Sequence, residues 1–222
     1  MSLSGAKPMG IFGPEWQDHP EKISESWDSL VADSDTVIVA GDISWAMRLG
    51  EAAPDLRFLA ERPGRKVLVR GNHDYWWKRE NTNKIQATLH PSITLLCGTS
   101  VVLNEVGITG TRGWRPEEAA DLDQAANRRI LERELRYLRA GLDSLPSGLS
   151  SKIVALHYPP FGEDQQPNEF FEVLAEHSVD ILVYGHIHGA GVAPEGNVRG
   201  VECHLVAVDH TDFSPKLILP CV

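Results

Sequence analysis

The chain has 222 residues, of which 42% are hydrophobic, and this size and composition predict one globular domain spanning residues 1–222. Acidic residues outnumber basic ones by 31 to 21, which gives a formal charge of −10. This balance argues against a protein that coats nucleic acid or an anionic membrane, because phosphate groups are held by an excess of Lys and Arg. No apolar run approaches the roughly 20 residues that span a bilayer.

Cysteine usage and the N-terminus predict a soluble, cytoplasmic protein. Cys97, Cys203 and Cys221 form no Cys-x-x-Cys pair, so neither a disulfide framework nor a thiolate zinc site is indicated. The first residues also lack the charged and then apolar pattern of a secretory signal. Both features favour a reducing compartment.

The predicted elements alternate between strands and helices, which is typical of an α/β fold. In chain order we expect a helix over Pro20–Val31, a strand over Thr36–Ala40, a helix over Glu51–Ala60 and a strand over Lys66–Arg70. Next come short strands over Ile93–Leu96, Val101–Asn104 and Val106–Gly110, a helix over Leu122–Leu145 and a strand over Lys152–Leu156. The last elements are a helix over Asn168–Glu176, a strand over Asp180–Tyr184, a loop over Gly189–Gly200, and a hairpin of Gly200–Val208 with Lys216–Leu219.

The clearest helix carries a stripe of leucines at alternating steps of four and three, which are Leu131, Leu135, Leu138, Leu142 and Leu145. Such spacing places them on one face. The other face is rich in Arg and Glu and is predicted to be solvated. We therefore interpret the stripe as core rather than as part of a cofactor site.

Four predicted strands end in side chains that can bind metal ions. The segments that follow them are Gly41-Asp42, Gly71-Asn72-His73-Asp74, His157 and Gly185-His186-Ile187-His188. Strand ends meet at one edge of an α/β sheet, and glycine lets the backbone approach an ion closely. In an extended segment, His186 and His188 would point to the same side. We therefore expect these groups to converge on one crevice.

The expected ligand set combines carboxylate, amide and imidazole groups without a thiolate, which favours Mn, Fe or Zn. Taken alone, Asp42 and Asn72 would be interpreted as turn residues and His157 as a core histidine. All of them occur in this order, each after a predicted strand, and turn or core roles do not explain the set as a whole. A carboxylate such as Asp42 can bridge two metal ions. Two neighbouring metal ions are suited to catalysing an in-line displacement at phosphorus.

These blocks resemble the signature of the calcineurin-like metallophosphoesterase superfamily, and KPMGIFGPEW, GDISWAMRL, GNHDYWW, GTRGW and HYPP resemble a bacterial subgroup of predicted phosphohydrolases. The resemblance implies an αββα sandwich of two mixed β-sheets flanked by helices. It also implies a site with two divalent ions, at which a metal-bound hydroxide hydrolyses a phosphomonoester or phosphodiester. Asp42 would bridge the ions, Asn72, His157 and His186 would complete one, and His188 would serve the other. His73 would be the catalytic acid, oriented by Asp74.

One block of the superfamily has no counterpart before Gly41, namely the Asp-x-His that supplies two ligands to the ion served by His188. Asp18-His19 has the wrong spacing and is predicted to cap a helix. We therefore expect this sequence to hold at most one ion firmly and to hydrolyse phosphoesters poorly. We also expect the natural reading frame to extend upstream through a short apolar strand that ends in Asp-x-His.

Two classes of function remain open. The first is a phosphoesterase acting on a small phosphorylated substrate, and the second is a catalytically impaired binding or scaffolding module. A nuclease is a third interpretation, which the charge balance disfavours.

Several aromatic and basic residues flank the predicted site and are assigned with equal weight to substrate contact or to packing. These residues are Trp45, Trp76, Trp77, Trp114, Arg48, Arg112 and Arg115.

Overall fold

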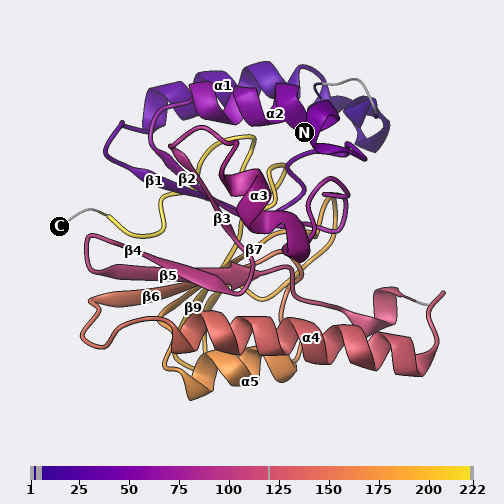
Figure 1. The fold of residues 1–222 in the computed structure, drawn as a ribbon. Helices are drawn as coiled ribbons and strands as arrows, with labels where there is room; N and C mark the ends of the chain where they lie inside the picture. The colour runs from indigo at the N-terminus through magenta and orange to yellow at the C-terminus, as the bar shows by residue number, and fades with distance from the viewer. Residues whose placement is uncertain (1–2, 4–6, 120, 221–222) are drawn as a thin grey trace.

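The computed structural model describes residue 3, residues 7–119 and residues 121–220. Two β-sheets lie face to face, and helices cover the outer face of each (Figure 1). The predicted sandwich of two sheets flanked by helices is therefore confirmed. Cys97 and Cys203 are free thiols, whereas Cys221 and the first two residues lie outside the described part of the chain.

The smaller sheet contains three parallel strands, β1 (Thr36–Val39), β2 (Arg65–Val69) and β3 (Ile93–Leu96), in that order. Its outer face is covered by α1 (His19–Leu30) and α2 (Leu49–Glu61), which are drawn at the top of Figure 1. A short helix, α3 (Thr82–Gln86), precedes β3. Short 3₁₀ turns lie in connections, at Met9–Phe12, Pro14–Trp16, Arg79–Asn81 and Pro116–Glu118.

The larger sheet has the strand order β4-β5-β6-β7-β9-β8 and mixed directions. Its strands are β4 (Thr99–Leu103), β5 (Val106–Thr111), β6 (Ser151–Leu156), β7 (Ile181–Tyr184), β8 (Gly196–Val198) and β9 (Val201–Leu205). Strands β5, β6, β7 and β9 are parallel, and β4 and β8 pair antiparallel at the two edges. The outer face carries α4 (Gln124–Asp143) and α5 (Glu169–Glu176), at the bottom of Figure 1.

Three apolar clusters correspond to the three interfaces of this four-layer structure. One joins α1 and α2 to the smaller sheet, and a second lies between the sheets, where Val67 and Val69 of β2 meet Ile153 and Val183. The third packs α4 and α5 on the larger sheet. The leucine stripe of α4 belongs to this third cluster, as predicted.

The bounds of α4 differ from the expectation for local reasons. The Asp123 side chain accepts a hydrogen bond from Ala126 N at 2.7 Å and so begins the helix two residues after Leu122. Leu145 precedes Pro146, a position that disfavours helical geometry. Asp18 does occupy the position before α1, but its side chain makes no capping hydrogen bond.

The expected C-terminal hairpin is wrong. Strand β9 ends at Leu205 and pairs with β7 and with β8, a strand that lies within the segment expected to be a loop. Residues 216–219 form no strand. Pro215 and Pro220 bracket this run, and proline lacks the amide donor that a sheet requires.

Candidate metal centre

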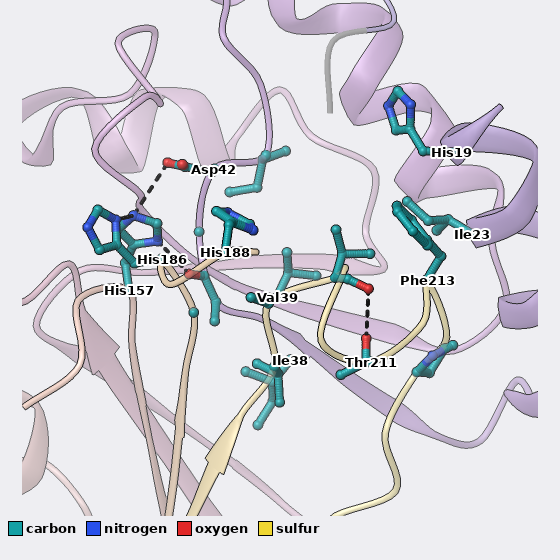
Figure 2. Close-up of a pocket in the computed structure, with 18 of the residues that line it drawn as sticks. His19, Ile23, Ile38, Val39, Asp42, His157, His186, His188, Thr211 and Phe213 are labelled. Atoms are coloured by element: carbon teal, nitrogen blue, oxygen red, sulfur yellow. Dashed lines mark hydrogen bonds and ion pairs between the residues drawn. The ribbon is translucent and has the colours of Figure 1, made fainter. Parts of the chain in front are cut away.

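The predicted ligands follow the C-terminal ends of four strands, two in each sheet. Asp42 and Asn72 come after the neighbouring parallel strands β1 and β2, and His157 and His186 come after β6 and β7. The carboxyl ends of parallel strands lie at the same edge. Figure 2 shows Asp42, His157, His186 and His188 together at one end of a cavity.

Three potential ligand atoms from these residues lie around a fourth, His157 Nε2. This atom is 2.6 Å from Asn72 Oδ1, 3.2 Å from His186 Nδ1 and 3.6 Å from Asp42 Oδ1. Atoms that each bind one ion at 2.0–2.2 Å are about 2.8–3.1 Å apart at an octahedral right angle and about 3.3–3.6 Å apart in a tetrahedron. The observed spacing is close to that of a ligand set around one divalent ion.

The opposite nitrogen of each imidazole is held by an oxygen atom. His157 Nδ1 is 2.8 Å from Ala40 O, and His186 Nε2 is 2.6 Å from Glu118 Oε2. A proton on each of those nitrogens leaves a lone pair on His157 Nε2 and on His186 Nδ1. These two lone pairs and the side-chain oxygens of Asn72 and Asp42 then face one another with no proton between them. A cation bound among them would be coordinated by all four atoms. The donor set therefore fits a divalent metal ion.

Two glycines allow the backbone to come this close. Gly41 has φ of 96°, and a Cβ atom there would stand 2.6 Å from His157 Nδ1. A Cβ atom on Gly71 would overlap the Asp42 side chain and backbone. Asp42 itself, with φ of 55°, is one of the non-glycine residues held in the left-handed region. Such strain is concentrated at functional sites in proteins.

His188 forms a separate pair with an aspartate from the segment after β9. His188 Nδ1 is 2.7 Å from Asp209 Oδ1, and Asp209 Oδ2 accepts a hydrogen bond from Gly189 N at 2.8 Å. Although burial raises the pKa of Asp209, these two hydrogen bonds bring it below its ordinary value on balance. His188 thus uses Nδ1 for Asp209, which leaves Nε2 as the nitrogen that could bind a metal ion.

The segment from Gly185 to His188 is a tight turn, which corrects the expectation of an extended strand. Gly185 O accepts a hydrogen bond from Ile187 N at 2.9 Å, and His186 between them has φ of 73°. His186 turns toward His157 and Glu118, whereas His188 turns toward Asp209. The two imidazoles line the same cavity but have different partners.

The structure does not place Asp74 where it would orient the His73 ring. Asp74 is fully buried, and its carboxylate accepts hydrogen bonds from Ser44 N, Gly71 N and Trp76 Nε1 at 2.8–3.0 Å. These bonds join the loop after β1 to the loop after β2. The reason is geometric, because Asp74 points into the protein while the His73 ring faces Trp45 and Tyr75.

Burial dominates the electrostatics of this cluster. It lowers the pKa of His157 to about 4, so that the imidazole is neutral near pH 7 and its nitrogen can donate to a metal. Burial, followed by the charge of Asp42, raises the pKa of Asp74 to about 6. Burial also raises the pKa of Asp42, but the charge of His157 and the His73 amide bring it below its ordinary value.

Of the flanking residues named from the sequence, three tryptophans are core residues. The side chains of Trp76, Trp77 and Trp114 are at most 8% exposed, so they pack in the core. Trp45 lies at the site against His73. Arg48 is exposed.

The remaining two arginines form ion pairs. The Arg112 guanidinium pairs with Glu134 at 3.6 Å. Arg115 pairs with Glu118, which in turn contacts His186. A chain of contacts thus connects Arg115 to the ligand set.

A cavity of 320 Å³ extends from the ligand cluster along β1. Its walls are mainly apolar and come from β1, α1 and the segment after β9. The far end, where Figure 2 shows His19, Ile23 and Phe213, is lined by a small apolar cluster of Met9, Trp16 and Phe213. The cavity is large enough for a small molecule whose polar group lies against the histidines.

Two residues of the site were not found from the sequence, namely Glu118 and Asp209. Glu118 ends a short 3₁₀ turn and Asp209 lies in a turn after β9, and neither follows a strand-end motif. Only the tertiary structure therefore brings them to His186 and His188. A weak indication of Asp209 was present in the sequence, because this carboxylate lies four residues after the end of β9 and so near the same edge of the sheet as the other ligands. Such second partners of metal-binding histidines are found through contacts rather than through sequence spacing.

The family model for calcineurin-like phosphoesterases matches residues 16–190, which contain every metal ligand predicted from the sequence. The chain belongs to this family. Family membership supports the hydrolysis of phosphoesters and the use of divalent metals as the general chemistry of the site. Within the described residues, however, no three His, Cys, Asp or Glu side chains are already arranged as a metal-binding group, and the cluster at His157 includes the Asn72 amide.

Similarity to individual proteins is local or distant. The chain is 41% identical to the Gene 66 protein of Mycobacterium phage L5 over 58 residues and 42% identical to the Gene 66 protein of Mycobacterium phage D29 over 57 residues. Each alignment covers 26% of this chain and 28% of the phage protein.

Two solved structures are similar over more of the chain. A protein of unknown function, AQ665 from Aquifex aeolicus, is 15% identical with a TM-score of 0.46, over 97% of this chain and 91% of that one. TT1561 of Thermus thermophilus is 16% identical with a TM-score of 0.48, over 78% of this chain and 77% of that one.

In the described part of this chain, no helix is both long and apolar enough to cross a membrane.

Proposed function

We propose that this chain is a cytoplasmic, metal-dependent phosphoesterase that hydrolyses a small phosphomonoester or phosphodiester. The observation that carries the proposal is the convergence of Asn72 Oδ1, His157 Nε2, His186 Nδ1 and Asp42 Oδ1. Family membership supplies the reaction class. The free thiols of Cys97 and Cys203 are consistent with a reducing compartment.

The residues take distinct roles in this proposal. Asn72, His157, His186 and Asp42 hold one divalent ion, and His188 faces a second position to which Asp42 also contributes. Mn, Fe or Zn bound there would lower the pKa of a bound water and polarise the phosphoryl oxygens. His73 holds the proton that the leaving oxygen requires. Asp74 maintains the loop that carries His73, through its bonds to Ser44 and Gly71.

The test combines metal content with turnover. The purified protein, stripped of metal and then loaded separately with Mn²⁺, Fe²⁺ or Zn²⁺, should hydrolyse p-nitrophenyl phosphate or bis(p-nitrophenyl) phosphate with at least one of them. Asp42→Asn should reduce metal content and turnover together, because it weakens a ligand shared by both positions. Full metal occupancy at an unchanged rate in Asp42→Asn would contradict the assignment, as would loaded protein that turns over neither ester.

A second candidate function is a metal-binding module with impaired catalysis. It is favoured by one observation, which is that no three His, Cys, Asp or Glu side chains among the described residues are arranged as a metal site, at His188 or elsewhere. This candidate predicts one ion per chain and no turnover. Two ions per chain with turnover would exclude it.

A further inference from the structure

His73 is held in place by contacts that do not involve Asp74. The indole of Trp45 stacks on the His73 imidazole, with ring centroids 3.4 Å apart and planes inclined by 16°. Trp45 comes from the loop after β1, and His73 comes from the loop after β2. The two loops that deliver Asp42 and Asn72 therefore also deliver this stacked pair.

A second contact fixes the rotation of the ring within its plane. His73 Nδ1 is 3.1 Å from the Tyr75 hydroxyl, and the two rings meet edge to face at 6.0 Å. The other nitrogen, Nε2, accepts a hydrogen bond from Asn72 Nδ2 at 3.2 Å and so lies on the side of the ligand cluster. Stacking restricts the plane, and the hydroxyl determines which nitrogen faces the site.

Trp45 is itself held from its opposite face. Lys7 Nζ lies 3.3 Å from the centroid of the Trp45 ring, in a cation–π contact. Both faces of the indole are thereby covered, one by an ammonium group and one by an imidazole. An aromatic group of a substrate therefore has no free face of Trp45 on which to stack, which removes the alternative assignment of this residue as a substrate platform.

We propose that Trp45 is a positioning residue that holds the His73 imidazole in the plane from which Nε2 reaches the leaving oxygen. This inference rests on the proposed phosphoesterase function. In the step it serves, a water oxygen bonds to phosphorus as the bond between phosphorus and the leaving oxygen breaks. The leaving oxygen takes the Nε2 proton of the doubly protonated His73 ring, and the proton released by the attacking water passes to solvent. A positioned acid of this kind contributes about 10²–10⁴-fold to a rate.

The kinetic test compares leaving groups. Trp45→Leu removes the stack and should lower kcat about tenfold for an alkyl phosphate, whose leaving oxygen needs a proton, with less than about a twofold loss for p-nitrophenyl phosphate. Trp45→Phe keeps an aromatic face and should restore most of the rate. Met47→Ala, on the same loop with a 66% exposed side chain, is the control and should leave the rate unchanged.

The combination with His73→Gln separates positioning from other roles. In the His73→Gln background, Trp45→Leu should cause no further loss, because the group that it positions is gone. An equal loss in both backgrounds would overturn the inference, and so would a rise in KM without a change in kcat. Metal content should stay the same in all of these variants, and loss of metal in Trp45→Leu would also overturn it.

A spectroscopic readout works without turnover. An indole stacked at this distance shifts the carbon-bound protons of the His73 ring upfield, and Trp45→Leu should return them toward the position of an exposed histidine, with Met47→Ala unchanged. If loaded protein hydrolyses none of the esters, the proposed function has failed, and this signal alone decides the positioning. An unshifted His73 signal in the unmodified protein would refute it.

Discussion

Gly71 lies directly against Asp42, and no larger residue fits there without moving this carboxylate. A Cβ atom at position 71 would overlap both the side chain and the backbone nitrogen of Asp42. The requirement is steric, since the neighbour is the proposed ligand itself. The same reasoning applies to Gly41, which adjoins His157.

Gly71→Ala should therefore lose metal while the fold survives. We expect the affinity for metal to fall about tenfold or more relative to the unmodified protein, because loss of even a group that supports a ligand typically weakens binding by about 10–100-fold. Gly50→Ala is the matched control, since a Cβ atom at position 50 has nothing within 4 Å. Normal metal content in Gly71→Ala, measured by elemental analysis, would show that the Asp42 position is not critical.

His157 gives the site a defined pH dependence. Its pKa falls from 6.5 to about 4 in the folded protein, so between these values only the unfolded chain takes up a proton. The stability that depends on neutral His157 is fully present above pH 6.5 and is lost as the pH falls toward 4. The shift corresponds to roughly 3 kcal/mol.

A comparison with His157→Gln isolates this effect. Glutamine does not titrate, so the excess stability of the metal-free unmodified protein over the variant should shrink by about 3 kcal/mol between pH 6.5 and pH 4. Asp74, whose pKa is raised to about 6, makes the opposite contribution to stability over part of this pH range. This contribution is present in both proteins and cancels in the comparison. The measurement is urea unfolding at several pH values. A constant difference would mean that His157 is not buried as the structure has it.

At the scale of elements, α4 is attached to the larger sheet through its leucine stripe. Leu138 is fully buried, and Glu134 on the same helix accepts a hydrogen bond from Thr111 of β5 at 2.6 Å. The apolar contacts carry most of the attachment, because the net contribution of one hydrogen bond is only about 1 kcal/mol.

Leu138→Ala should lower the free energy of unfolding by about 2–5 kcal/mol, through lost burial and the cavity left behind. Arg129→Ala, on the exposed side of the same helix, should change it by less than about 0.5 kcal/mol. Denaturant unfolding of both variants provides the measurement. Equal effects in the two would contradict the assignment of the stripe to the core.

The sequence predicted the elements whose signal is local. The long helix was readable from its leucine spacing, and the four main strands were readable from apolar runs that stop at glycine or histidine. The last strands were assigned wrongly because β8 has only three residues and pairs with β9, a contact that leaves no periodic pattern. Likewise, Glu118 and Asp209 reach the histidines only through the tertiary fold.

At the scale of the whole molecule, the candidate centre joins the two sheets. Asp42 and Asn72 come from the smaller sheet and His157 and His186 from the larger one, so that an ion bound there would link both layers. This arrangement also rests on the buried cluster between the sheets. The order of the layers was predicted through the resemblance, whereas the packing of these ligands against one another depends on tertiary contacts that leave no pattern in the sequence.

Metal binding should therefore stabilise the entire fold. At a free ion concentration one hundred times the dissociation constant, binding adds about 2.7 kcal/mol. For a chain of this size, this raises Tm by roughly 5–10 °C. Mn²⁺ or Zn²⁺ should produce the shift in the metal-stripped protein, and a chelator should reverse it. His157→Gln should show less than half of the shift, and an undiminished shift would place the ion elsewhere.

The most direct measurement of the central claim is anomalous diffraction from crystals soaked with Mn²⁺ or Zn²⁺. We predict a peak about 2.0–2.3 Å from Asn72 Oδ1, His157 Nε2, His186 Nδ1 and Asp42 Oδ1, the four atoms that converge in this structure. A peak near His188 would define the second position and would extend the claim. Crystals with no peak at the four atoms, or with the ion bound elsewhere, would contradict it.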